Sequence, residues 1–100
     1  MIKVVFTYRT KKKDLSKLME KFVESGNNPK FHSPVTNKKI EMFQRFEGED
    51  AIVVLDIYYD SLADYQERTT FERSLPEWNA IWFSDSIEHE EVSVEVFDVL

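Results

Sequence analysis

Apolar side chains recur along this chain with two different periods, and the period predicts which segments are strands and which are helices. Residues 2–9, 39–47, 51–60 and 91–99 either alternate apolar with polar positions or run continuously apolar, as β-strands do. After the first strand the apolar positions lie three or four residues apart, which predicts an amphipathic helix. The apolar positions of that helix are Leu15, Leu18, Met19, Phe22 and Val23.

A second helical region follows the third strand. Asp60 and Ser61 are suitable N-caps for it, because their side-chain oxygens can accept hydrogen bonds from the first turn. A break is expected at Ser74, which forms a capping-box spacing with Glu77 three residues later. The element order βαββαβ predicts a single α+β domain over residues 1–100. This is a ferredoxin-like two-layer sandwich whose antiparallel sheet has the order 4-1-3-2, with both helical regions on one face.

The strand at residues 51–60 is apolar on both faces, which is unusual for an antiparallel sheet with one face in water. The side chains on one of its faces are expected to pack against the helices. The other face carries Ile52, Val54 and Tyr58, with Asp56 as the one carboxylate among them. An apolar second face of this size is typical of an interface, so we expect a homodimer in which two sheets pack across a two-fold axis. The predicted dimer-interface residues are Lys3, Val5, Thr7, Arg9, Ile52, Val54, Asp56, Tyr58, Glu95 and Phe97.

Charged residues on this predicted interface need partners, because a single buried charge is costly. Antiparallel pairing of the strands predicts that Lys3 lies near Asp56 and that Arg9 lies near Glu95. We therefore interpret Asp56 as one half of an ion pair rather than as an acid or base.

Composition narrows the classes of function. The chain has no cysteine and a formal net charge of −6. Residues 1–50 carry 11 Lys or Arg and 7 Asp or Glu, whereas residues 51–100 carry 2 and 12. An acidic balance disfavours nucleic acid as a partner, since such binding depends on cations that neutralise phosphates. No apolar run approaches the roughly 18 residues of a membrane span, and the N-terminus lacks a signal-peptide pattern, so we expect a cytoplasmic protein without a membrane partner.

Trp78 and Trp82 are four residues apart, so they share one face of the last helical segment. Two interpretations are open: the indoles pack into the core, or they line a pocket for a flat aromatic ligand between helices and sheet. A cavity of at least about 300 Å³ would favour the pocket. The candidate pocket residues are Tyr8, His32, Arg45, Tyr65, Trp78 and Trp82.

No constellation in the sequence predicts a catalytic centre. His32 lies in a polar connection and His89 precedes the last strand, and two histidines without a partner at i, i+4 do not make a metal site. There is no nucleophile–base motif, glycine-rich phosphate loop or EF-hand spacing. We therefore predict neither a metal nor a cofactor, and the sequence leaves open whether the chain is an enzyme.

Two short motifs resemble a known group of proteins. Residues 60–65, Asp-Ser-Leu-Ala-Asp-Tyr, follow the third strand, and residues 75–78, Leu-Pro-Glu-Trp, open the last helical segment. In these motifs and in its element order the chain resembles the dimeric α/β-barrel superfamily, which includes NIPSNAP-like proteins, antibiotic-biosynthesis monooxygenases and EthD-like proteins. The resemblance implies a ferredoxin-like fold that pairs into a dimeric barrel. Both motifs are structural in character, so they imply no catalytic residue.

Three alternative functions stay open, two of them suggested by members of this superfamily. The first is NIPSNAP-like binding of a small aromatic molecule between helices and sheet. The second is a cofactor-independent monooxygenase of the antibiotic-biosynthesis type, which oxidises electron-rich aromatic substrates without metal or flavin. The third is a non-enzymatic structural or interaction module with no ligand pocket. Haem-degrading members combine an Asn, a Trp and a His, and this chain departs from them because Thr7 and Tyr8 occupy the region of the Asn.

Overall fold

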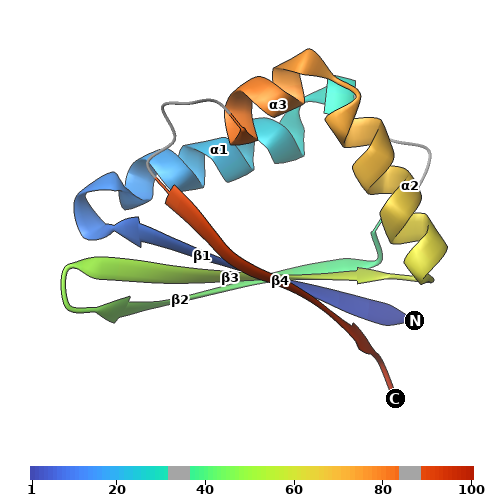
Figure 1. Cartoon of the computed structure of the whole chain (residues 1–100), viewed down its shortest axis with the longest axis horizontal. Helices are drawn as coiled ribbons and strands as arrows, with labels where there is room; N and C mark the ends of the chain where they lie inside the picture. Colours follow the sequence, from blue (N-terminus) through green and yellow to red (C-terminus); the bar gives the residue numbers. More distant parts are fainter. Residues whose placement is uncertain (32–36, 84–88) are drawn as a thin grey trace.

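Four antiparallel strands form one layer of the molecule, and the helices form a second layer on one side of it (Figure 1). The computed structural model describes residues 1–31, 37–83 and 89–100. The sheet has the order β2-β3-β1-β4, which is the predicted order 4-1-3-2 counted from the other edge. The predicted α+β class and strand order are therefore confirmed, and the fold is compatible with a ferredoxin-like domain. The strands are β1 (Ile2–Lys11), β2 (Lys39–Glu47), β3 (Asp50–Tyr59) and β4 (His89–Asp98).

Helices join the strands on one face of the sheet (Figure 1). Between β1 and β2 lie a 3₁₀ turn η1 (Lys12–Asp14), helix α1 (Leu15–Asn27) and a second turn η2 (Pro29–Phe31). Between β3 and β4 lie α2 (Leu62–Arg73) and α3 (Pro76–Trp82). Within the described ranges, none of the helices has the length and apolar composition that crossing a membrane requires.

The start of α2 agrees with the sequence, and the start of α3 does not. Ser61 is the N-cap of α2, and its hydroxyl accepts a hydrogen bond from the Asp64 N–H at 3.2 Å. The predicted capping box at Ser74 is wrong, because this residue ends α2 and its hydroxyl donates to the Phe71 carbonyl. Leu75 takes the N-cap position of α3 without a side-chain hydrogen bond, and the proline that follows supplies the first helical turn.

The core lies between the central strands and the helices. Both β1 and β3 turn alternate side chains toward the helices, and Val4 and Val53 there are fully buried. The edge strands are less well covered on the same face: Ile40 of β2 is 52% exposed and Val94 of β4 is 41% exposed. The helix layer therefore covers the middle of the sheet and leaves both edges open. The buried core clusters are Tyr8, Leu18, Val53 and Trp82, and Ile2, Val4 and Tyr59.

A β-bulge divides β4 into two parts. The pairing of β1 with β4 shifts by one residue after Thr7, and Val92 is left without a partner in β1. Because side chains alternate along a strand, one extra residue moves every side chain beyond it to the other face. His89 and Glu91 consequently lie on the same face as Tyr8, toward the helices.

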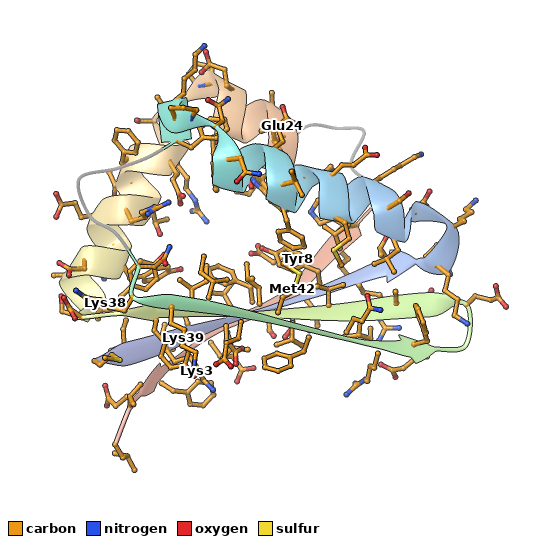
Figure 2. The ribbon with its side chains drawn as sticks, turned by 180° about the vertical axis from the view of Figure 1, so that it is seen from behind. Lys3, Tyr8, Glu24, Lys38, Lys39 and Met42 are labelled. Carbon is orange, nitrogen blue, oxygen red and sulfur yellow. The ribbon has the colours of Figure 1, made fainter. Side chains whose placement is uncertain are left out.

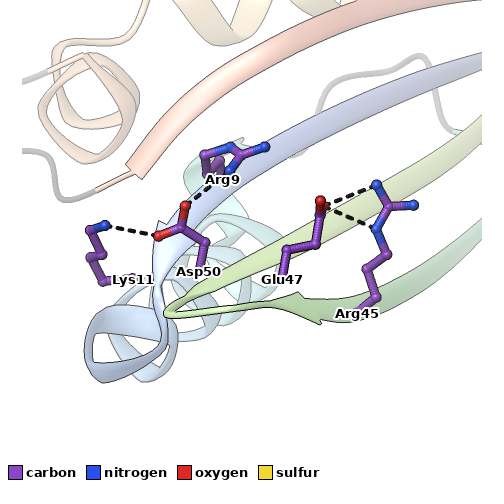
Figure 3. A network of polar contacts seen from close by, with 5 residues as sticks. All are labelled: Arg9, Lys11, Arg45, Glu47 and Asp50. Atoms are coloured by element: carbon purple, nitrogen blue, oxygen red, sulfur yellow. Dashed lines mark hydrogen bonds and ion pairs between the residues drawn. The ribbon is translucent and has the colours of Figure 1, made fainter.

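The predicted contact between Arg9 and Glu95 is wrong. In the observed register Glu95 lies opposite Val5. Arg9 instead donates to Asp50 at 2.9 Å, and Lys11 binds the other oxygen of Asp50 at 3.0 Å (Figure 3). These hydrogen bonds, led by that of Lys11, hold the pKa of Asp50 below its usual range. The cause of the error is the register: Glu95 lies opposite Val5, four residues before Arg9 on β1, whereas Asp50 at the start of β3 is within reach of the Arg9 guanidinium.

Burial along α1 generates a stability prediction. Leu18 is 2% exposed in the core, whereas Val23 on the same helix is 61% exposed. We expect Leu18→Ala to lower the free energy of unfolding by about 2–5 kcal/mol, because it removes buried apolar atoms and leaves a cavity. The matched variant Val23→Ala should change it by no more than about 0.5 kcal/mol. Urea denaturation followed by circular dichroism measures both, and equal losses would contradict this assignment of the core.

Candidate functional site

A cavity of about 380 Å³ lies between the helices and the sheet. Every strand and every α-helix among the described residues contributes to its wall. Figure 2 shows Tyr8 and Met42, two of its lining residues, on the helix side of the sheet, with Lys3 and Lys39 on the other side. Eight of the 21 described lining residues carry a Phe, Tyr or Trp ring. The aromatic rings that line it belong to Phe6, Tyr8, Phe22, Tyr59, Tyr65, Trp78, Trp82 and Phe83.

One end of the cavity is built by rings that also belong to the core. Tyr8, Phe22 and Trp82 form a triangle, with ring centroids 5.2 to 5.9 Å apart. Trp78 packs edge-on against Phe31 at 5.3 Å. Each indole packs against neighbouring rings, and both also border the cavity.

The other end of the cavity is lined by tyrosines. The rings of Tyr59 on β3 and Tyr65 on α2 have centroids 5.4 Å apart, and Phe6 meets Tyr65 edge-on at 6.4 Å. Burial raises the pKa of Tyr59 to about 12, and the nearby Glu72 carboxylate adds to the effect. Burial likewise raises the pKa of Tyr8, with Glu91 adding to it. Both phenols therefore stay protonated at any ordinary pH.

The bulge in β4 supplies polar groups to the same space. His89 packs edge-on against Tyr8 at 5.7 Å and against Trp82 at 5.5 Å, and its Nδ1 lies 3.3 Å from the Lys21 ammonium. A lysine can only donate, so this contact makes Nδ1 the acceptor and places any ring proton on Nε2. Glu91 lines the cavity two residues further along β4.

An ion pair from α2 lies in the wall. The Arg68 Nε donates to Glu72 Oε2 at 3.3 Å, and each side chain is only 15% exposed. Burial raises the pKa of Glu72, while the charge of Arg68 opposes that rise. Arg73, one residue beyond, also lines the cavity, and its guanidinium lies over the Phe83 ring at 5.4 Å.

The structure brings together most, but not all, of the residues predicted for the pocket. Tyr8, Tyr65, Trp78 and Trp82 line the cavity. Arg45 does not: it lies opposite Ile52, on the face away from the helices, and donates to Glu47 Oε2 at 3.1 and 3.0 Å (Figure 3). The predicted His32 falls outside the described residues.

Several polar lining residues were missed by the sequence analysis, although a signal for one group was present. The cavity side of α2 repeats with helical spacing but is mostly polar, whereas the buried side of an amphipathic helix is normally marked by an apolar stripe. His89 and Glu91 gave no such signal, because a one-residue bulge leaves no mark in an alternating pattern. The cavity-facing residues of α2 are Tyr65, Arg68, Thr69, Glu72 and Arg73.

The face of the sheet that points away from the helices, here called the open face, carries the residues predicted for the dimer interface. Register pairs Val5 with Asp56 and with Glu95, which places all three on this face. The predicted ion pair is present, with Lys3 Nζ 3.5 Å from Asp56 Oδ2. Asp56 is 8% exposed, and its Oδ1 is buried without a hydrogen-bond partner among the described residues. No described helix covers this face (Figure 1).

Comparison of the sequence with models of known protein families gives no match, and comparison with curated proteins gives none either. Across the described ranges, no three His, Asp or Glu side chains are grouped as metal ligands. Proposals about function therefore depend on the cavity and on the open face.

The raised tyrosine pKa generates a prediction at alkaline pH. Tyr59 holds its proton up to about pH 12 when folded but only to about pH 10 when unfolded. Between these values the unfolded chain binds fewer protons, so the free energy of unfolding should fall as the pH rises, by roughly 3 kcal/mol in total. Urea denaturation across this range should show a shallower fall for Tyr59→Phe than for the wild type. Equal slopes would show that Tyr59 is accessible to solvent.

Proposed function

We propose that this protein binds a small aromatic molecule in the cavity between helices and sheet. The observation that supports this is the cavity of about 380 Å³ with its aromatic wall. Its volume lies in the range of small-molecule sites, which is about 300–1,000 Å³. Rings that enter it can stack on or meet the edges of the lining side chains, and such aromatic contacts contribute about 0.5–1.5 kcal/mol each beyond simple burial.

A structural module without a ligand would need this volume to be filled by the chain's own side chains. Trp82 and Phe22 do pack together, with centroids 5.2 Å apart, yet the space beside them stays open. Proteins generally fill their interiors to the density of organic crystals, so an unfilled space of this size favours a binding site over a packing module. A cofactor-independent monooxygenase would need the same binding step, so a binding test bears on both functions.

We also propose that the protein is a homodimer whose open faces pack together, as in the dimeric α/β-barrel superfamily and its NIPSNAP-like members. Phe43 and Phe97 are 52% and 48% exposed on this face, which is a large apolar area to leave in water. The face also carries charges of both signs, which can pair with each other when the same surface meets its own copy.

Binding can be tested with a cavity-filling variant and its neighbour. Thr69 lines the cavity, whereas Thr70 is exposed on the same helix and does not. We expect naphthalene or 2-naphthol to raise the melting temperature of the wild type, since a ligand at 100 times its Kd adds about 2.7 kcal/mol of stability. Thr69→Phe should abolish that rise by filling the space, and Thr70→Phe should retain it. The proposal fails if neither compound shifts the wild type in a thermal-shift assay.

Two phenylalanines of β2 provide a matched test of the dimer. Phe43 and Phe46 are 52% and 54% exposed, and they lie on opposite faces of the sheet. Light scattering at micromolar concentration should give the mass of a dimer for the wild type and for Phe46→Asp. We expect Phe43→Asp to give a monomer, because it places an unpaired charge in the proposed interface. A monomeric wild type would overturn this assembly.

A further inference from the structure

The polar side of the cavity has one acceptor that the protein leaves partly unused. Glu72 lies in the wall between Arg68 and Arg73, and its side chain is only 15% exposed. Arg68 engages one oxygen, Oε2, at 3.3 Å. The second oxygen, Oε1, accepts no hydrogen bond from the described residues, although a carboxylate can accept about four. A carboxylate oxygen in this position can accept a proton donor that enters the cavity.

The surrounding groups favour a neutral donor over an anion. The charge of Arg68 is already offset by Glu72, and Arg73 is stacked over Phe83. Glu91 adds a second negative charge to the wall. An anionic ligand would therefore meet carboxylates of its own sign in a space that burial has made poor at solvating charge.

The pKa values of two tyrosines that line the cavity indicate how this environment affects a phenol. Tyr8 and Tyr59 both line it, and the pKa of each is raised, chiefly by burial and in addition by Glu91 and Glu72 respectively. The same space disfavours the phenolate form of a bound aromatic alcohol for the same physical reasons. It therefore suits a ring that carries a neutral hydroxyl group.

We infer that the ligand of this cavity is an aromatic alcohol of the phenol or naphthol class, whose hydroxyl donates to Glu72 Oε1 while its ring lies among the aromatic side chains. This inference rests on the proposed aromatic-binding function. Glu72 is the residue that determines specificity, and Arg68 positions its carboxylate through the contact to Oε2. The aromatic wall supplies affinity for any ring of suitable size.

Three related compounds test the inference on the wild-type protein. Naphthalene has no hydroxyl, 2-naphthol has one, and 2-methoxynaphthalene keeps the oxygen but has no proton to donate. We expect 2-naphthol to bind about tenfold more tightly than either of the others, as a hydrogen bond to a charged acceptor provides. Naphthalene is smaller than 2-naphthol and 2-methoxynaphthalene is larger, so an affinity that rises or falls steadily with size cannot place 2-naphthol first, and loss of the preference in Glu72→Met separates the hydrogen bond from an optimum of size. Equilibrium dialysis at neutral pH measures all three dissociation constants.

Three variants then identify the acceptor. Glu72→Met removes the acceptor but keeps a side chain of similar length, and should abolish the preference for 2-naphthol while retaining naphthalene binding. Glu67→Met is the control on the same helix, because Glu67 is exposed and does not line the cavity. Glu91→Met tests the competing carboxylate and should leave the preference in place.

The possible outcomes separate this inference from the proposed function. If naphthalene binds and 2-naphthol binds no more tightly, the inference fails and the aromatic site stands. If the preference is lost in Glu91→Met but kept in Glu72→Met, the assignment of the acceptor is overturned. If none of the three compounds binds the wild type, the proposed function fails together with the inference. Should Glu72→Met not fold, the wild-type ranking still decides whether the site selects for a donor.

Discussion

Antiparallel pairing of β1 with β3 is the interaction on which the rest of the structure depends. It runs without interruption from Ile2 opposite Tyr59 to Lys11 opposite Asp50. It therefore determines on which face of the sheet each side chain of the two central strands lies. Register sets which residues meet the helices and which form the open face. Both the cavity floor and the Lys3–Asp56 pair follow from this one alignment.

A short helix layer over a wide sheet explains the cavity. The chain places its helices over the central strands, and α3 has only 7 residues. Large rings such as Trp82 and Phe22 hold the layers together at one end, while at the other the layers meet through tyrosines. Between them α2 presents a largely polar side, and polar side chains with fixed partners do not collapse into a space as aliphatic ones would. The opening is thus a product of how the aromatic and ionic contacts are distributed.

The strands, their order and the first cap of α2 could be predicted from the sequence because they depend on local periodicity and turn chemistry. Arg9 could not be placed, because its choice between Asp50 and a carboxylate of β4 depends on distances set by the whole sheet. Two of the cavity's polar residues, His89 and Glu91, depend on a bulge that periodicity does not record. Glu72 was within reach of a sequence argument: it lies seven residues after Tyr65, on the same side of a helix. Polar stripes carry information about cavities in the way that apolar stripes carry information about cores.

The unpaired Val92 bears on which changes this chain can tolerate. Substitutions along β4 alter one side chain each, but an insertion or deletion on either side of the bulge would exchange the two faces of half the strand. Glu90 would then enter the cavity in place of Glu91, and the groups beside Tyr8 would change together. The length of β4 is therefore under tighter constraint than its composition, and homologous chains should vary in sequence there before they vary in length.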